Sequence, residues 1–377
     1  MNKDLFLQND MEEAEPSSKS QISARALLTC YRRDARKHKS QIIKAQALKL
    51  GFFACGIAKA GPVDEDTASH YRQWLVSGGH ADMHYLENNL DKRLDPTLLL
   101  EGARSIIVVA LNYAPTRRLQ EEEYQIAAYA YGKDYHDVLK HRLIQLTQHL
   151  LPSTLHPSPV TIHPSPVTHK ICTDTVPILE RYWAQQAGIG FIGRNHQLII
   201  PHAGSMFFLG EIITTAEFDT YDTPMENRCG TCHRCVEACP TGALQMEDGR
   251  WKMEDSCAQP IFNFQFSIFN SKKCLSYQTI ENRGSIDESL KDKLGNSIYG
   301  CDRCQQVCPW NRFATPTDIP ELQPSDTLLN MTREKWQHLS VEEYRELFRG
   351  SAVKRAKYEG LMRNIKAVAE SEVRSEE

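Results

Sequence analysis

The chain contains 377 residues, of which 41% are hydrophobic, and it carries a formal net charge of −4. At roughly 100–200 residues per domain, this length predicts two or three domains with packed cores. The negative charge argues against a generally basic nucleic-acid-binding protein, although it does not exclude a local basic patch. The longest apolar runs are of strand length, so no membrane span is expected.

The first residues, 1–20, are polar and acidic and lack the basic start and apolar centre of a signal peptide. We expect a disordered tail here and a cytoplasmic protein. Twelve cysteines are many for that compartment, where disulfides rarely persist. Eight of them form two clusters, and the other four are interpreted as small buried residues or bystanders. These four are Cys30, Cys55, Cys172 and Cys257.

Residues 21–218 mix strand and helix patterns, which predicts an α/β or α+β domain with its own core. The β-branched run SIIVVALNYAP, residues 105–115, is typical of a buried strand closed by proline. MFFLGEIITT, residues 206–215, predicts a second strand. Between them, leucines recur at spacings of three and four residues, which predicts a helix with one apolar face. These are Leu139, Leu143, Leu146 and Leu150.

Two segments of this region have a structural rather than a chemical interpretation. HPSPVT occurs at residues 156–161 and again at 163–168, and proline at this density indicates a duplicated exposed loop. GIGFIG, residues 188–193, matches a dinucleotide-binding pattern. It follows the helical run ILERYWAQQA where that pattern requires a strand, so we interpret it as a helix end followed by a glycine turn.

The first cysteine cluster lies in RCGTCHRCVEACPTGAL, residues 228–244. Its spacing, Cys-x2-Cys-x2-Cys-x3-Cys-Pro, is that of bacterial ferredoxins, in which three thiolates hold one [4Fe–4S] cluster and the fourth holds a neighbouring cluster. Structural zinc uses two separated cysteine pairs and does not require this fourth cysteine. The pattern therefore predicts iron–sulfur chemistry. The four residues are Cys229, Cys232, Cys235 and Cys239.

The second cluster, in YGCDRCQQVCPW, has only Cys301, Cys304 and Cys308, because the first position of the pattern falls on Ile298. By the ferredoxin pairing, Cys308 joins Cys229, Cys232 and Cys235 at one cluster. Cys301, Cys304 and Cys239 would hold the other, with a fourth thiolate from either Cys257 or Cys274. Two adjacent clusters carry single electrons toward an acceptor, which we expect in the first domain.

Together with four other segments, the two cysteine-rich runs make the chain resemble the epoxyqueuosine reductase family. The segments DTVPILER, AGIGFIGRN, GSMFFLGEI, CGTCHRCVEACPTGAL, KKCLSYQTIE and YGCDRCQQVCPWNR follow one another in the family's order. The resemblance implies an α+β fold, with a cobalamin-binding domain at 21–218, a ferredoxin-like two-cluster module at 219–315 and a short helical segment at 316–377. This last segment would be a remnant of the family's HEAT-like repeats.

The activity that the resemblance implies is reduction of the epoxide of epoxyqueuosine in the tRNA anticodon loop to queuosine, the last step of queuosine biosynthesis. The cofactors would be cobalamin and two [4Fe–4S] clusters, with electrons from a flavodoxin- or ferredoxin-type donor. A monomer is expected. Two other interpretations remain open on the sequence: a reductive dehalogenase-like cobalamin enzyme acting on a small molecule, or a ferredoxin-type electron carrier.

The resemblance also suggests individual site residues. Asp174 of DTVP would be the proton donor, and burial against the corrin should raise its pKa. Arg93, Arg181, Asn195 and His196 would contact cobalamin, with Arg181 facing the cofactor rather than Asp174.

Three further residue sets are singled out, the first by the resemblance and the other two by the residues themselves. Cys274 occupies the place of the family's cluster ligand, whereas Cys257 lies in an insertion rich in phenylalanine. The alternation of that insertion, FNFQFSIF at 262–269, predicts a packed strand face. A basic stretch near the C-terminus is a candidate tRNA-phosphate contact. Its basic residues are Lys354, Arg355, Lys357 and Arg363.

Overall fold

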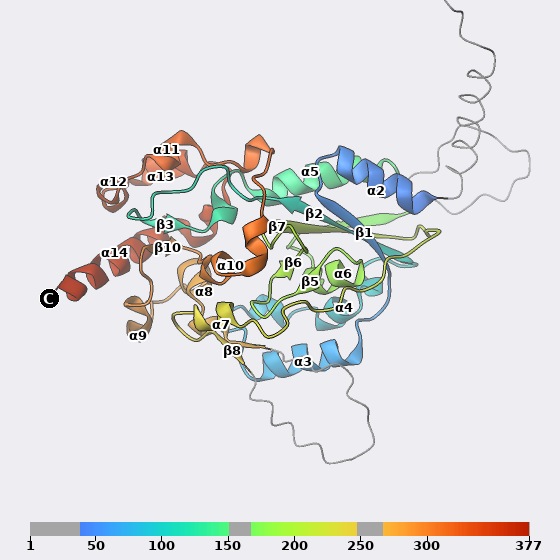
Figure 1. Cartoon of the computed structure of the whole chain (residues 1–377), viewed down its shortest axis with the longest axis horizontal. Coiled ribbons are helices and arrows are strands. Elements are labelled where there is room, and N and C mark those ends of the chain that lie inside the picture. Colours follow the sequence, from blue (N-terminus) through green and yellow to red (C-terminus); the bar gives the residue numbers. More distant parts are fainter. Residues whose placement is uncertain (1–37, 151–166, 247–266, 377) are drawn as a thin grey trace, which may run out of the picture.

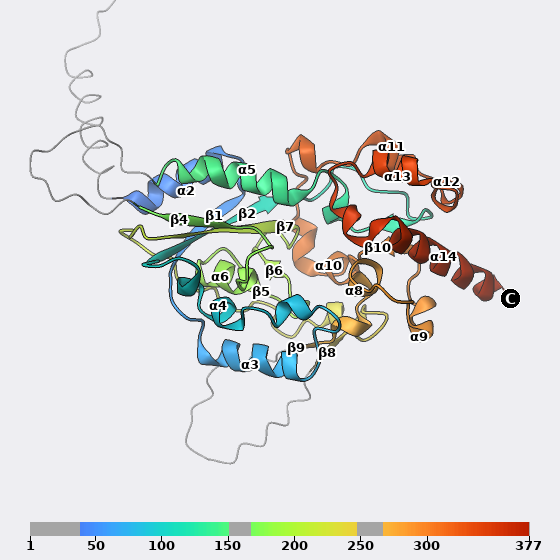
Figure 2. The same ribbon diagram turned by 180° about the vertical axis from the view of Figure 1, so that it is seen from behind.

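The computed structural model describes residues 38–150, 167–246 and 267–376. Figures 1 and 2 show a sheet covered by helices at one end of the molecule, the C-terminal helices at the other, and the cysteine-rich segments between them. Several sequence predictions lie outside the described residues. They concern Cys30, Cys257, most of the HPSPVT repeats, and Phe262, Phe264 and Phe266.

A four-stranded antiparallel sheet forms the centre of the first region, in the order β1-β2-β7-β4. The two central strands are β2 (Ser105–Asn112) and β7 (Phe207–Thr214), which pair over their whole length. Both strands are apolar on either side because both faces of the sheet are covered. The outer strands are β1 (Ala54–Lys59) and β4 (His169–Cys172). The two strands predicted from β-branched runs are therefore confirmed.

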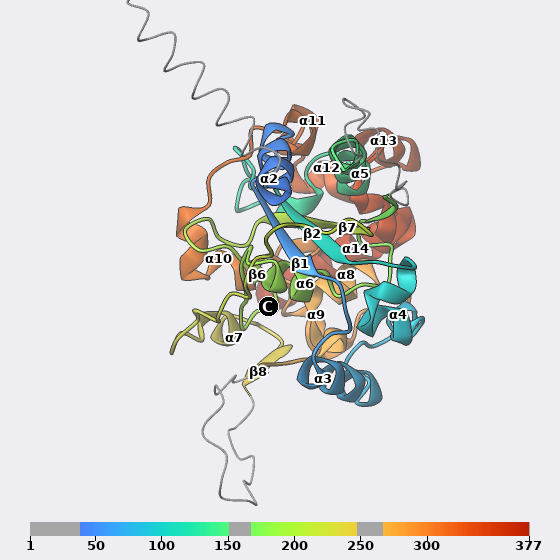
Figure 3. The same cartoon turned by 90° about the vertical axis from the view of Figure 1, so that its right-hand side faces the viewer.

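Helices cover the two faces of this sheet (Figure 3). On one face, α2 (Lys39–Lys49) and α5 (Tyr135–Thr147) pack their apolar sides against β2 and β7. The predicted leucine face of α5 is confirmed, since Leu139, Leu143 and Leu146 are fully buried. On the other face, α6 (Glu180–Gln186) contributes Trp183 and Ala184 to a separate core.

Helix α6 ends as GIGFIG predicted, because Gly188 follows it with φ of +68°. The helix begins at Glu180 and its N-cap is Leu179. The remaining elements of this region are one twelve-residue helix and several short elements. They are α3 (Glu65–Val76), η1 (His84–Leu86), α4 (Leu90–Leu94), η2 (Pro96–Leu99), η3 (Ala128–Ala130), β5 (Phe191–Ile192) and β6 (Leu198–Ile199).

The cysteine-rich region consists of short helices and hairpins, as expected where metal clusters replace an apolar core. Its two ferredoxin-like runs form the neighbouring helices α7 (Arg234–Glu237) and α10 (Arg303–Gln306). The other elements connect these runs. They are β8 (Leu244–Met246), β9 (Ser267–Phe269), η4 (Ser271–Lys273), α8 (Leu275–Ile280), α9 (Glu288–Lys291), β10 (Ser297–Tyr299) and η5 (Pro309–Phe313).

The C-terminal region is helical, as predicted, and ends in the long helix α14 (Lys357–Glu376). It shares one apolar core with residues 119–131 and 275–299, and the fully buried Trp336 and Tyr124 belong to this core. Strand β3 (Gln125–Ile126) pairs with β10 and joins the regions further. The other elements are η6 (Pro320–Leu322), α11 (Asp326–Leu329), α12 (Arg333–Gln337), α13 (Val341–Leu347) and η7 (Ala352–Ala356).

These regions together confirm the α+β class, with helices and an antiparallel sheet in one molecule. Within the described ranges, no helix combines the length and the apolar character needed to cross a membrane.

Candidate active site and cysteine clusters

Eight of the cysteines lie in two groups, and the thiols of each group act on one another electrostatically. In the first group, burial together with nearby Cys229, Cys308 and Cys232 raises the pKa of Cys235 to about 11. Cys308 in turn has a pKa raised by burial and by Cys229 and Cys232. This group combines three cysteines of the first run with the last cysteine of the second, the pairing that ferredoxin spacing predicts.

The second group contains Cys239, Cys274, Cys301 and Cys304. Burial raises the pKa of Cys301 to about 11, and Cys274 adds to that shift. The pKa of Cys274 is raised by burial and by Cys239. Burial raises the pKa of Cys304, and Cys301, Cys274 and also Cys235 of the first group add to this shift. The two groups are therefore neighbours. Cys274 thus lies with the other three cysteines of the second group. Cys257 is outside the described residues.

The turn between β5 and β6 connects the sheet region to both cysteine groups. Arg194 donates a hydrogen bond from Nη1 to the carbonyl of Cys232, at 2.6 Å. Asn195 donates from Nδ2 to the carbonyl of Cys304, at 3.4 Å, and its Oδ1 accepts from the backbone of Gln197. Asn195 is 4% exposed. Its amide is therefore used within the protein, which favours a role in holding the Cys304 loop over direct contact with a cofactor.

Asp174 lies in the loop after β4, and its backbone is in the left-handed region, with φ of +53°. A non-glycine residue in this conformation costs free energy, which is a frequent feature of functional sites. Its N–H donates to Oε1 of Glu180 at 2.6 Å, and Oδ2 accepts from the hydroxyl of Tyr135 at 2.5 Å. The side chain is 56% exposed. Asp174 therefore presents an exposed carboxylate and does not cap α6, whose N-cap is Leu179. We refer to the cluster of Asp174, Tyr135 and His136 as the recess.

His136 stands between two carboxylates. Its Nδ1 lies 2.7 Å from Oδ1 of Asp134 and its Nε2 lies 3.4 Å from Oδ2 of Asp174. These contacts, first with Asp134 and then with Asp174, raise the pKa of His136 to about 9. The hydrogen bond from His136 in turn lowers the pKa of Asp174, against a smaller opposing effect of burial. The upward shift expected at Asp174 rests on burial against the corrin and stays a prediction; with the protein's own groups alone, a hydrogen-bonded, oppositely charged neighbour outweighs desolvation and the pKa is lowered.

Two glutamates behind Asp174 do have raised pKa values. Burial and the charge of Asp174 raise the pKa of Glu180 to about 7. Glu211 is fully buried on β7, and burial raises its pKa well above the usual value, with Glu180 and Asp174 adding to the shift. Neither carboxyl oxygen of Glu211 has a hydrogen-bond partner among the described residues. Burial without a hydrogen-bond partner favours the protonated form of a carboxyl.

The three other predicted cofactor residues lie around the same recess. Arg181 donates from Nη1 to the carbonyl of His196, and its charge also lowers the pKa of Asp174. It is therefore close to Asp174, contrary to the expectation that it faces only the cofactor. Arg93 is 8% exposed, donates from Nη2 to the carbonyl of Tyr85, and keeps Nε without a partner among the described residues.

Sequence reasoning missed Tyr135, His136 and the two glutamates. The segment GKDYHDVLK at residues 132–140 carried a signal, because Asp134 caps α5 and places the next two side chains at its start. Nothing in the sequence pairs this helix start with DTVP, some forty residues later. The contact depends on α5 and β4 both packing against β7.

The C-terminal basic stretch lies beside this recess, but its residues differ in role. Lys354 is exposed and close enough to Asp134 to lower its pKa slightly. Arg355 forms an ion pair with Glu281 at 2.8 Å and lies 5.8 Å from the ring centre of Tyr85. Arg363 is structural, since its guanidinium donates to the carbonyls of Asn282, Gly284 and Gln278.

Comparisons with known proteins agree with this arrangement. Residues 93–175 match the family model described as Epoxyqueuosine reductase QueG, DUF1730, and residues 228–311 match a 4Fe–4S double cluster binding domain. An epoxyqueuosine reductase of Cellulophaga algicola is 38% identical over 87% of this chain and 97% of its own length. One of Leadbetterella byssophila is 38% identical over 88% and 98%.

Solved structures give the same result. A crystal structure of an epoxyqueuosine reductase with an epoxyqueuosine-modified tRNA-Tyr stem loop has a TM-score of 0.72 and 28% identity, covering 87% of this chain and 80% of that one. The Bacillus subtilis enzyme, in a structure whose catalytic aspartate loop is swung out of the active site, has a TM-score of 0.70 and 26% identity, covering 87% and 80%. The cysteine spacing, the fold and these similarities agree, and the chain belongs to the epoxyqueuosine reductase family.

Proposed function

We propose that this protein reduces the epoxide of epoxyqueuosine in the tRNA anticodon loop to the alkene of queuosine, the last step of queuosine biosynthesis. The observation that carries the proposal is the Asp174 recess, where a carboxylate, a protonated histidine and a tyrosine hydroxyl meet in a chain that also holds two cysteine groups. Removing the epoxide oxygen as water consumes two electrons and two protons. The cysteine groups are suited to supplying the electrons, and the recess is suited to supplying protons.

For the electrons, we infer that the two cysteine groups each hold one [4Fe–4S] cluster. Cys229, Cys232, Cys235 and Cys308 would hold one, and Cys239, Cys274, Cys301 and Cys304 the other. Eight thiols gathered in two sets of four, with no disulfide among the described cysteines, suit two cubane clusters. Each cluster supplies or accepts single electrons.

The residues around the recess also fit cobalamin. The periphery of this cofactor carries amides and a phosphate, which arginines and backbone groups recognise. Arg93 has a buried Nε with no partner among the described residues, and Arg181 extends along the loop of His196 at the same recess. Both arginines and the backbone around His196 would hold the cofactor, with Asn195 supporting that loop. Bound there, cobalamin would supply the carbon–oxygen bond chemistry.

For the protons, we infer that His136 passes one proton through the Asp174 carboxylate to the epoxide oxygen. The second proton, which releases that oxygen as water, comes from solvent, to which the side chain of Asp174 is exposed. At neutral pH the proton resides on His136, whose pKa is about 9, while the pKa of Asp174 is lowered. The hydroxyl of Tyr135 orients the carboxylate of Asp174 by donating a hydrogen bond to its Oδ2. General acid catalysis through such a pair contributes about 10²–10⁴-fold to a rate.

The substrate would approach the recess from the side of the C-terminal region. An epoxyqueuosine reductase has been crystallised with a modified tRNA-Tyr stem loop, and this chain has the same overall fold. Exposed Lys354 and Lys357 beside the recess suit phosphate contacts. A cytoplasmic monomer supplied with electrons by a flavodoxin- or ferredoxin-type donor is consistent with this role.

The proposal is tested in cells that lack the gene, by mass spectrometry of tRNA nucleosides. We expect epoxyqueuosine to accumulate and queuosine to disappear, with both restored by the wild-type gene and not by Asp174→Asn. A knockout strain with normal queuosine would refute the proposed function, provided that no second reductase is encoded in the strain.

A further inference from the structure

An open cleft of about 700 Å³ lies between the two ferredoxin-like runs, bounded by α7 on one side and by the α10–η5 segment on the other. Cys308 lines this cleft, together with Pro309 and Gln306. Cys308 belongs to the first cysteine group, so a ligand of that cluster borders the outside of the molecule. Electron transfer weakens steeply with distance, which makes such a place suitable for electron entry.

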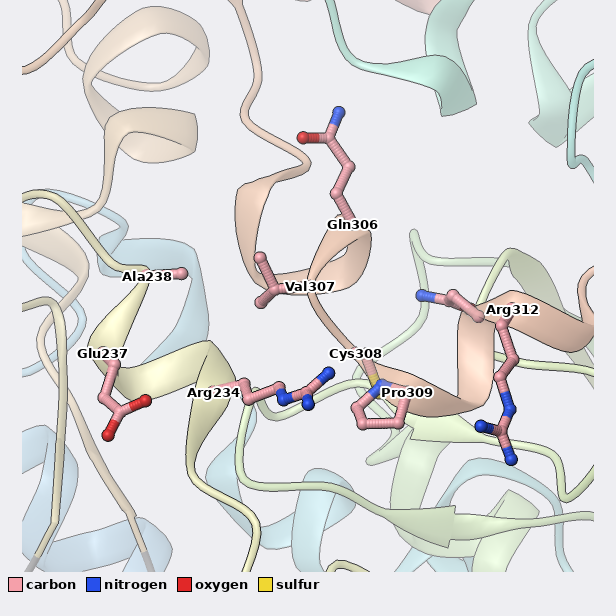
Figure 4. A pocket seen from close by; sticks show the side chains of 9 residues that line it. Arg234, Glu237, Ala238, Gln306, Val307, Cys308, Pro309 and Arg312 are labelled. Atoms are coloured by element: carbon pink, nitrogen blue, oxygen red, sulfur yellow. The ribbon is translucent and has the colours of Figure 1, made fainter.

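The cleft carries positive charge on both sides of Cys308. Figure 4 shows Arg234 reaching from α7 toward Cys308 and Pro309, with Arg312 beyond these two residues. Both arginines are exposed, and neither forms an ion pair with any residue that the structure describes. The one acidic residue lining the cleft, Glu237, lies 3.3 Å from Nε2 of His233. Two cations without counterions around a redox ligand suit an acidic partner.

The second cysteine group lies deeper and closer to the substrate recess. Gly300, which precedes Cys301, is linked through Tyr299 and Tyr129 to Tyr135, the partner of Asp174. A second cleft of about 390 Å³ beside this group is lined by Pro240, Thr241 and Lys272, but by no cysteine. The spatial order therefore runs from the cleft, through the first group, to the second group and on to Asp174.

We propose that the Arg234–Arg312 cleft is the docking site of an acidic one-electron carrier protein, such as a flavodoxin or a ferredoxin. Each docking event oxidises the carrier by one electron and reduces the cluster held by Cys229, Cys232, Cys235 and Cys308 by one. Two events supply the two electrons that the reaction consumes. The proposal rests on the proposed function only for the fate of these electrons; the docking itself requires no tRNA.

Complementary charges accelerate such encounters and make them sensitive to salt. The test uses the enzyme with both clusters reconstituted and a purified bacterial flavodoxin as the probe. Binding is measured by thermophoresis, and cluster reduction by stopped-flow absorbance, both at low and high salt. Arg234→Glu with Arg312→Glu should weaken binding and slow cluster reduction about tenfold or more at low salt. Reduction by dithionite, which needs no docking, should be unchanged.

Matched variants separate the cleft from general charge effects. Lys39→Glu with Lys49→Glu, on α2, changes the net charge equally and should leave binding intact. Lys272→Glu with Lys293→Glu reverses charge at the second cleft and should do the same. Glu237→Gln removes the one acid of the cleft and should strengthen binding. If charge reversal beside Cys235 prevents cluster assembly, Arg234→Gln with Arg312→Gln provides the test.

The proposal is overturned if the arginine variants bind flavodoxin as the wild type does, or if either lysine control loses binding to the same degree. Loss of tRNA binding with unchanged flavodoxin binding would also overturn it, by showing that the cleft contacts nucleic acid. If epoxyqueuosine is not reduced but the cleft variants still lose flavodoxin binding, the docking site stands and the proposed function alone fails.

Discussion

His136 lies between Asp134 and Asp174, and its raised pKa decides where the catalytic proton resides. A group with a raised pKa holds its proton below that value and loses it as pH rises through it. With a pKa of about 9, His136 remains protonated across the neutral range. Asp174, with its lowered pKa, is then a carboxylate that passes a proton on.

This arrangement predicts a specific pH profile. In the wild type, the single-turnover rate should fall above about pH 9, by about tenfold per unit, as His136 loses its proton. His136→Gln keeps a hydrogen-bonding side chain but has no titrating proton. Its rate should be lower by about 100-fold, and its profile should be flat from pH 8 to 10. If the rate of this variant still falls above pH 9 as in the wild type, that fall is caused by the titration of another group.

The site residues differ in how far the sequence could predict them. Asp174 was predicted from the motif DTVP, and the cysteines from their spacing, because both signals are contiguous along the chain. The lowered pKa that the protein's own groups give Asp174 could not be predicted, since it depends on His136, which approaches only through the packing of α5 and β4 on β7. Glu211 was hidden for the same reason: in the sequence it is one polar residue in an apolar strand.

Among the elements, the segment from η4 to α8 places Cys274 beside the second cysteine group. If Cys274 is the fourth ligand, Cys274→Ala should lose about half of the bound iron, because one of two clusters fails to assemble. Iron and sulfide analysis of the reconstituted protein measures this. Cys257→Ala is the control and should retain full iron. Equal iron retention by the two variants would remove Cys274 from the ligand set.

The structure divides the basic stretch at the C-terminus between η7 and α14. Lys354 and Lys357 remain exposed, whereas the side chain of Arg363 is bound to backbone carbonyls. Sequence alone could not separate these roles, because hydrophilic residues at similar spacing can face either solvent or a neighbouring loop.

We therefore expect the two lysines, and not Arg363, to contact tRNA phosphates. Lys354→Gln with Lys357→Gln should weaken binding of the anticodon stem loop and reduce the slope of log affinity against log salt by about 1 to 2. Lys39→Gln with Lys49→Gln is the control, since these exposed lysines lie on α2 at the far end of the molecule (Figure 1). A salt slope that is unchanged in the first pair would leave the lysines as solvated surface residues.

At the scale of the whole molecule, α14 joins the C-terminal region to the cysteine-rich region. Asn364 is fully buried and donates from Nδ2 to the carbonyls of Thr279, at the end of α8, and Ile298, in β10, both at 2.8 Å. The C-terminal helices were expected to be a remnant of tRNA-binding repeats. The shared core shows that they also support the segment that carries Cys301.

Replacing Asn364 with leucine leaves two buried carbonyls without a donor, at about 1–3 kcal/mol each. Thermal unfolding of the variant should begin at least about 4 °C lower, and cluster retention should fall with it. Lys366→Ala, on the exposed face of the same helix, is the control and should match the wild type. A variant with wild-type melting would show that α14 is dispensable for this part of the fold.

The central claim is that Asp174 delivers a proton to the epoxide of epoxyqueuosine. It is tested most directly by single-turnover conversion of an epoxyqueuosine-containing tRNA stem loop, with cobalamin and both clusters reconstituted. The wild type should form queuosine. Asp174→Asn, with the same cofactor content, should form it at a rate lower by about 100-fold or more. Queuosine formation at the wild-type rate by Asp174→Asn would contradict this account.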